Sequence, residues 1–325
     1  MKVLFIGGTG IISSACSELA IKKGIDLYHL NRGASVKVRP VIGVKTIKAD
    51  IRDPEATQLA LSDYHFDAVV EWIGFVPEHI QTDIELFRNK TKQYIFISSS
   101  AAYQTPPEKL PVTEETPLEN PFWEYARNKI ACENVLQKEY ELSGFPYTVV
   151  RPSHTYDKTL IPLMGGYTTL ARMKQGLSVI VHGDGASIWT LTHHTDFAKG
   201  LVGLLGKVEA IGQAYHITSD EWLSWESIFL KLARAMGVSP KLVHIPSDII
   251  ASYDKEIGDG LVGDKTHSMI FDNAKIKALV PEFRAEITFD QGAQEIVDWY
   301  EFNPERQIVD KRINALMDKM IAEYR

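Results

Sequence analysis

The chain has 325 residues, 45% hydrophobic and 24% charged, with a formal net charge of −7, two cysteines and no run of about 18 apolar residues. The charge argues against general binding of a nucleic-acid backbone, and the composition is that of a globular protein long enough for one large or two smaller domains. We expect a cytoplasmic protein with two buried, reduced thiols, no signal peptide and no membrane contact.

The N-terminal stretch carries the strongest local signal. Residues 2–6 are mostly apolar and β-prone, Gly7-Gly8-Thr9-Gly10 follows, and Ile11 to Lys23 has a helical pattern. A strand, a glycine turn and a helix N-terminus together form an anion site that suits a pyrophosphate. Ser13 stands where the third glycine of a G-x-x-G-x-x-G pattern would fall. We predict dinucleotide binding rather than an ordinary βα turn.

Strands and helices then alternate with short connections. We expect strands at 25–30, 44–49, 68–74, 93–97 and 147–151, and helices at 78–88 and 125–143. Such alternation predicts an α/β fold with a doubly wound parallel sheet covered by helices on both faces.

The end of the second strand bears on the choice of nicotinamide cofactor. A neutral Asn31 followed by Arg32 suits a 2′-phosphate and therefore favours NADP, although a solvated arginine is the alternative and NAD is not excluded. After the third strand, an acidic side chain at Asp50–Asp53 could bind the adenine amino group. A helix cap is the alternative, because Asp53-Pro54-Glu55 has the pattern of a helix start.

The catalytic candidates lie between residues 98 and 129. Ser98-Ser99-Ser100 follows the fifth strand, where open α/β sheets bind their ligands. Tyr125 and Lys129 are four residues apart, on one face of the next helix. We expect the lysine ammonium to lower the pKa of the phenol, so that Tyr125 can act as an acid or base near neutral pH.

With these residues in place, the chain resembles the extended short-chain dehydrogenases/reductases, the branch of sugar-nucleotide epimerases and dehydratases. The matching segments are Gly7–Gly10, Ser98–Tyr103, Tyr125-x-x-x-Lys129, Arg151–Tyr156, Val181–Gly185 and Asp196–Ala198. The resemblance implies a Rossmann fold with Tyr125 as acid/base, Lys129 holding the nicotinamide ribose and a serine binding the reacting oxygen. The family's Ser-x-x-x-Tyr arrangement selects Ser99, with Ser100 as the alternative.

These considerations define the expected site. We expect the cofactor to contact Gly7, Thr9, Gly10, Ile11, Ile12, Asn31, Arg32, Asp50, Ile51, Trp72, Ser98, Lys129, Pro152 and His154, and the substrate to contact Ser100, His154 and Trp189. Family members that act on sugar nucleotides usually carry an arginine in the segment that corresponds to 188–192, where this chain has none. The residues expected to bind the cofactor are therefore all present, whereas the arginine that would bind a substrate diphosphate is missing.

The second half of the chain predicts a smaller domain interleaved with the first. We assign residues 1–157 and 188–220 to the dinucleotide-binding domain, and 158–187 and 221–325 to a substrate-binding domain. His193-His194 does not predict a metal site, because adjacent strand residues point to opposite faces. By analogy with the family, helices 78–88 and 124–142 are candidates for a homodimer interface.

The sequence thus predicts an NAD(P)-dependent oxidoreductase of the epimerase/dehydratase type, acting on a carbinol or carbonyl of a small, sugar-like molecule. The alternative is a non-catalytic NAD(P)-binding sensor or an RNA-associated protein on the same fold.

Overall fold

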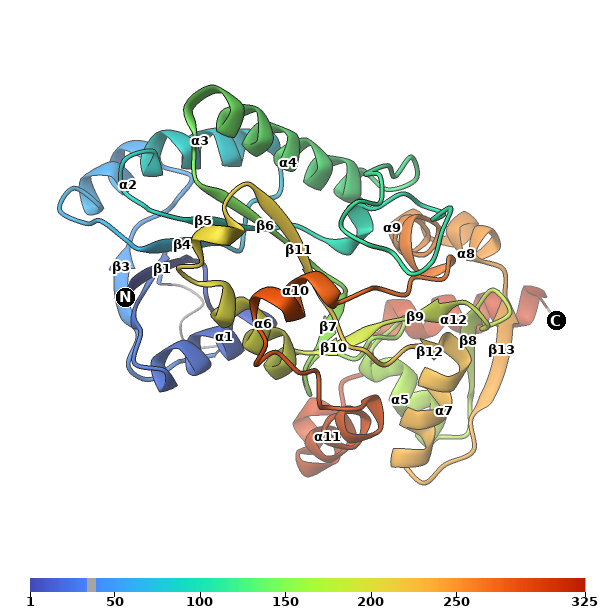
Figure 1. Ribbon diagram of the computed structural model, residues 1–325. Helices are drawn as coiled ribbons and strands as arrows, with labels where there is room; N and C mark the ends of the chain where they lie inside the picture. The colour runs from blue at the N-terminus through green and yellow to red at the C-terminus, as the bar shows by residue number, and fades with distance from the viewer. Residues whose placement is uncertain (34–38, 325) are drawn as a thin grey trace.

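A computed structural model describes residues 1–33 and 39–324. Its centre is a seven-stranded, entirely parallel sheet in the order β11-β6-β5-β4-β1-β2-β3 (Figure 1). The strands are β1 (Lys2–Ile6), β2 (Asp26–Asn31), β3 (Lys45–Lys48), β4 (Ala68–Glu71), β5 (Tyr94–Ile97), β6 (Tyr147–Pro152) and β11 (Gln213–Ile217). The order reverses beside β1, and ligands bind at such a switch point in open α/β sheets. The predicted doubly wound fold is confirmed.

Helices cover both faces of this sheet, because alternate residues of each strand face opposite sides. Val3 and Phe5 of β1 belong to a core with α1 (Ile11–Lys22) and α6 (His194–Leu204), whereas Leu4 and Ile6 pack on the side of α3 (Pro77–Phe87) and α4 (Glu124–Ser143). Figure 1 shows these two helical layers above and below the sheet. The homodimer through α3 and α4 stays a prediction.

Two predicted details are settled at the strand ends. β4 ends at Glu71 instead of Gly74, and in the turn that follows Glu71 Oε1 accepts the Ile73 N–H at 2.5 Å. Asp53 is the N-cap of α2 (Pro54–Ala60) and accepts the Ala56 N–H at 3.1 Å, so the cap interpretation is confirmed for this residue.

The remaining elements form a second group beside the carboxyl ends of the strands (Figure 1). Its helices are α5 (Tyr167–Lys174), α7 (Trp225–Ala235), α8 (Ser247–Tyr253), α9 (Lys255–Gly260), α11 (Phe289–Phe302) and α12 (Lys311–Tyr324). Two-stranded sheets pair β7 (His154–Tyr156) with β10 (Leu191–His193), β8 (Ser178–His182) with β13 (Lys241–Ile245), and β9 (Ile188–Trp189) with β12 (Leu223–Ser224). The division of the chain into two domains stays a prediction.

Short elements complete the description. They are the 3₁₀ turns η1 (Ser100–Ala102), η2 (Val208–Ala210) and η4 (Pro304–Arg306), the π-helical turn η3 (Leu261–Lys265), and α10 (Ala274–Leu279), which contributes Ile276 to the same core as α1 and α6. No helix in the described part of the chain is both long enough and apolar enough to cross a membrane.

Candidate active site

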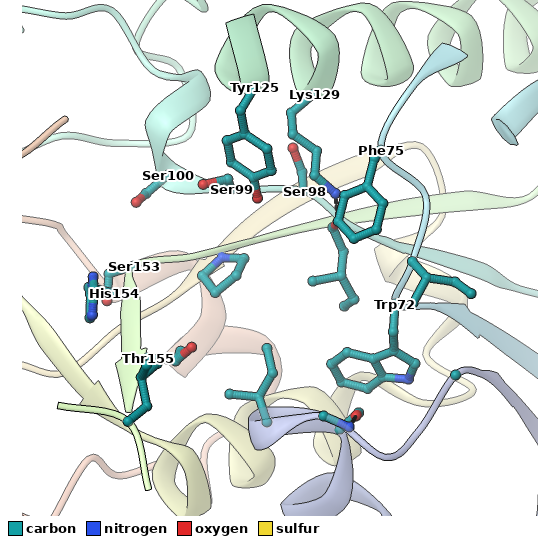
Figure 2. A pocket seen from close by; sticks show the side chains of 18 of the residues that line it. Trp72, Phe75, Ser98, Ser99, Ser100, Tyr125, Lys129, Ser153, His154 and Thr155 are labelled. Carbon is teal, nitrogen blue, oxygen red and sulfur yellow. Dashed lines mark hydrogen bonds between the residues drawn. The ribbon is translucent and has the colours of Figure 1, made fainter. Parts of the chain in front are cut away.

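A cavity of about 520 Å³ opens at the carboxyl ends of β1, β4, β5 and β6. The glycine loop and the start of α1 line one side, and Tyr125 and Lys129 of α4 line the other (Figure 2). Trp72 and Phe75 follow β4, Ser98, Ser99 and Ser100 follow β5, and Pro152, Ser153, His154 and Thr155 follow β6. The expected residues of the cofactor loop, the serine cluster and the Tyr–Lys pair therefore meet in one cavity.

The glycine loop has the backbone that its sequence demands. Gly7 and Gly8 have φ of 102° and 93°, which side chains other than glycine rarely adopt. A Cβ on Gly8 would lie 2.6 Å from the ring of His29, so the close packing requires glycine as well. At the expected third glycine, Ser13 Oγ accepts the Gly10 N–H at 2.8 Å. The serine thus stabilises the turn into α1.

The N-terminus of α1 offers a binding site for a phosphate. The first turn of a helix leaves N–H groups without intrahelical acceptors, and its dipole favours an anion. Gly10 is the N-cap of α1, and Gly7, Thr9, Gly10 and Ile12 line the cavity. The N–H groups of Gly7 and Gly10 already donate to the Leu30 carbonyl and to Ser13 Oγ. The N-terminus of α1 itself, beside a cavity of this size, therefore fits the pyrophosphate of a dinucleotide.

Tyr125 and Lys129 lie in the first turns of α4, and the lysine is held by the sheet. Lys129 Nζ donates to the Gly74 carbonyl at 2.7 Å and to the Ile97 carbonyl at 2.8 Å. Its distance to the centroid of the Tyr125 ring is 5.8 Å. The phenol hydroxyl points toward the Ser99 side chain, with which it forms a hydrogen bond (Figure 2).

The expected lowering of the Tyr125 pKa is wrong for this structure. Burial raises the pKa of Tyr125, and the Ser99 hydrogen bond only partly offsets this effect. Burial also lowers the pKa of Lys129 to about 8. The physical reason is that both groups lie in a low-dielectric environment and the ammonium is directed at two backbone carbonyls rather than at the phenol oxygen.

A buried ionic network supports the floor of the cavity. Ser98 Oγ donates to Glu133 Oε1 at 2.5 Å, and Arg151 donates to both oxygens of the same carboxylate, at 3.1 and 2.6 Å. The side chains of Glu133 and Arg151 are each 6% exposed. Because Glu133 belongs to α4 and Arg151 precedes Pro152 on β6, this network fixes α4 against two strand ends.

Other expected residues lie outside the cavity lining. Ile51 is buried, and Asn31, Arg32 and Asp50 lie farther along the carboxyl edge, where Arg32 is 3.8 Å from Asp50. Ile11 begins α1 without lining the cavity. Trp189 is 1% exposed and packs against Trp225, so the structure places it behind the cavity wall.

Several lining residues were absent from the expected site. Trp123 precedes α4, and Leu160, Asp264 and Lys265 come from the second group of elements. The position of Trp123, two residues before Tyr125, is a signal that the sequence offered. No local sequence signal marks Asp264 and Lys265, because they reach the cavity only through the packing of η3.

Comparison with known proteins identifies the family of the chain. A model of the family described as "NAD dependent epimerase/dehydratase family" matches residues 3–218. The chain is 26% identical over 261 residues to "Chloroplast stem-loop binding protein of 41 kDa b" of Arabidopsis thaliana, covering 75% of this chain and 65% of the relative. It is 32% identical over 170 residues to a UDP-glucose 4-epimerase of Lactobacillus helveticus, covering 46% and 51%. The matches thus span about half to two thirds of these two relatives.

The solved structures show the same fold. The dTDP-glucose 4,6-dehydratase of Bacillus anthracis in complex with NAD superposes with a TM-score of 0.75 at 20% identity, covering 94% of this chain and 98% of that one. The family model matches about two thirds of the sequence, and the glycine loop and the Tyr–Lys pair lie in one cavity. The chain therefore belongs to the NAD-dependent epimerase/dehydratase family.

Proposed function

We propose that this protein is an NAD(P)-dependent oxidoreductase of the epimerase, dehydratase or reductase type, acting on a carbinol or carbonyl of a sugar-like molecule. The observation that carries the proposal is the meeting of Tyr125, Ser99 and Lys129 in the cavity that the glycine loop lines. The bound nicotinamide would supply the hydride acceptor or donor. The residues Gly7–Gly10, Ile12, Trp72, Ser98, Lys129 and Pro152 would hold the cofactor.

The chain's own groups account for the proton and for the orientation of the substrate. With its pKa raised by burial, Tyr125 is a neutral phenol at pH 7, and it donates its proton to a carbonyl oxygen as that oxygen gains negative charge. In the opposite direction the phenolate accepts the proton of a carbinol. When Tyr125 is a phenolate, the Ser99 hydroxyl donates a hydrogen bond that stabilises it. When Tyr125 is a neutral phenol, the Ser99 hydroxyl donates instead to the substrate carbonyl oxygen and orients it.

Cofactor binding and substitution of Tyr125 test the proposal. Isothermal titration with NADPH and NADH comes first, because failure of the protein to bind either nucleotide refutes it. Tyr125→Phe is then expected to lower kcat for the reduction of a carbonyl substrate about 10²-fold or more, with nucleotide affinity within about twofold of wild type. Tyr140→Phe, also on α4 but 38% exposed, is the control. Retained activity in Tyr125→Phe would remove this residue from the mechanism.

We also propose a preference for NADP over NAD. Arg32 is 73% exposed at the carboxyl edge, and Asn31 Nδ2 is a buried donor without a hydrogen-bond partner among the described residues. Both groups suit the oxygens of a 2′-phosphate. Arg32→Ala is expected to weaken NADPH binding about tenfold or more, as the loss of a charge-assisted hydrogen bond implies, and to leave NADH binding unchanged. Equal losses for both nucleotides would contradict the assignment.

A second candidate, binding of a structured RNA, is favoured by one observation, the relative named as a stem-loop binding protein. A gel-shift titration with a stem-loop RNA at 0.15 M salt separates the two candidates. With a net charge of −7, we expect no complex at micromolar protein.

A further inference from the structure

A second cavity of about 430 Å³ adjoins the first on the side of α9 and α12. Trp123, His154, Leu160 and Lys265 line both cavities. The two spaces therefore meet beside His154, and a molecule with its reacting oxygen at Tyr125 can extend into the second cavity.

The wall of this second cavity is mainly apolar. Its lining includes Leu163, Met164, Ile180, Phe229, Ile257 and Ile313. Five separate segments contribute these residues: the chain before α5, then β8, α7, α9 and α12. Burial of an apolar ligand surface against such a wall is favourable by about 25 cal/mol per Å².

The basic groups at this cavity are already paired. Among the described lining residues the basic ones are Lys265 and Arg312. Lys265 Nζ lies 3.1 Å from Asp264 and donates to the Gly260 carbonyl at 3.3 Å, and Arg312 donates to Asp254 at 2.5 Å. Glu256 adds a negative charge to the lining. A diphosphate would therefore meet no unpaired cation among the described residues here, although burial of an anion requires one.

Two imidazoles add uncharged polar groups to the wall of the cavity. The Nε2 atoms of His154 and His182 are buried and have no hydrogen-bond partner among the described residues. His182 is 8% exposed, and its ring lies 4.9 Å from that of Trp225. Burial lowers the pKa of His154 to about 3 and that of His182 to about 4, so both rings are neutral at pH 7. A neutral ring nitrogen donates to or accepts from a hydroxyl, carbonyl or amide, and it does not hold an anion by charge.

We propose that the second cavity binds the non-reacting part of the substrate, and that this part is an uncharged, largely apolar ring system with a hydroxyl or carbonyl that hydrogen-bonds to the histidines. It is not a nucleoside diphosphate. The inference rests on the proposed function, since it specifies which molecules present a carbonyl or carbinol to Tyr125.

Isothermal titration calorimetry with two probes, 2-acetonaphthone and UDP, tests this inference. 2-Acetonaphthone is a neutral aromatic ketone, and UDP carries the diphosphate. We expect the wild-type protein to bind the ketone at least tenfold more tightly than UDP, with a negative heat-capacity change from burial of apolar surface. The measurement requires no turnover.

Matched variants localise the binding. Ile257→Glu places a carboxylate at a half-buried position of the wall on α9 and is expected to weaken ketone binding at least tenfold. Ile257→Leu keeps the wall apolar and is expected to retain ketone binding. Leu142→Glu, at a position 72% exposed on α4, is the control and should leave it within twofold. NADPH affinity, measured on each variant, reports whether the protein is folded.

Three results would overturn the inference: UDP binding as tight as that of the ketone, no binding of the ketone, or unchanged ketone binding in Ile257→Glu. If the wild type bound neither NADPH nor NADH while the ketone data followed the expected pattern, the oxidoreductase proposal would fail and the ligand class of the cavity would stand.

Discussion

The buried pair of Glu133 and Arg151 allows a quantitative test of how α4 is held against the sheet. Glu133→Ala removes the carboxylate that accepts from both Arg151 and Ser98, and it leaves a guanidinium that is 94% buried without its counter-ion. Removal of one partner of a buried pair costs about 3–5 kcal/mol, because the remaining charge has lost both its water and its partner. For a chain of this size, at about 2 °C per kcal/mol, the melting temperature should fall by about 6–10 °C.

The same helix provides the matched control. Glu139 on α4 pairs with Arg88, whose side chain is 42% exposed. Water can replace the lost contact there, so Glu139→Ala should cost at most about 1 kcal/mol, or about 2 °C. Differential scanning fluorimetry and urea unfolding at pH 7 measure both variants.

A double variant separates a buried charge from lost packing. In Glu133→Leu/Arg151→Met both charges are absent and the volume is kept, so most of the stability lost in Glu133→Ala should return. Equal shifts for Glu133→Ala and Glu139→Ala, or no recovery in the double variant, would refute the reasoning that burial sets the cost of breaking this pair.

Two further predictions concern other buried features. Burial beside the Glu71 carboxyl raises the pKa of Asp83, so the stability from its protonated form is present below about pH 4, its ordinary range, and is lost as the pH rises above it. Asp83→Asn should therefore be more stable than the wild type in urea unfolding at pH 8 and should match it at pH 4. A pH-independent difference would contradict this. Gly8→Ala forces a Cβ to 2.6 Å from the His29 ring and should abolish NADPH binding in a fluorescence titration. The control Gly144→Ala, with φ of 72° but open space around the Cβ, should lower the free energy of unfolding by about 1 kcal/mol and bind NADPH normally. Equal NADPH affinity in both variants would show that the close approach at Gly8 does not matter.

Much of the fold could be predicted from the sequence, because its signals are local. The alternation of apolar strands with amphipathic helices follows from side-chain periodicity, and the glycine loop is specified within ten residues. The spacing of four between Tyr125 and Lys129 sets their common helix face whatever surrounds them. For the same reason the N-cap at Asp53 was among the predicted alternatives.

The hydrogen-bond partners and pKa values of the site residues depend on contacts between segments that are distant in the sequence. The direction of Lys129 toward the carbonyls of Gly74 and Ile97, and the raised pKa of Tyr125, both follow from how α4 packs on β4 and β5. A helix pattern gives the face of a side chain, but not its acceptors or the local dielectric.

The sequence by itself therefore determined the doubly wound sheet, the anion-binding loop and the identity of the catalytic candidates. Only the tertiary structure decided what surrounds them. It buried Trp189, carried Asp264 and Lys265 to the cavity from a segment more than a hundred residues after Tyr125, and assembled the apolar wall from α7, α9 and α12. The physical reason is that burial and charge pairing belong to neighbours in space, and these neighbours are far apart along the chain.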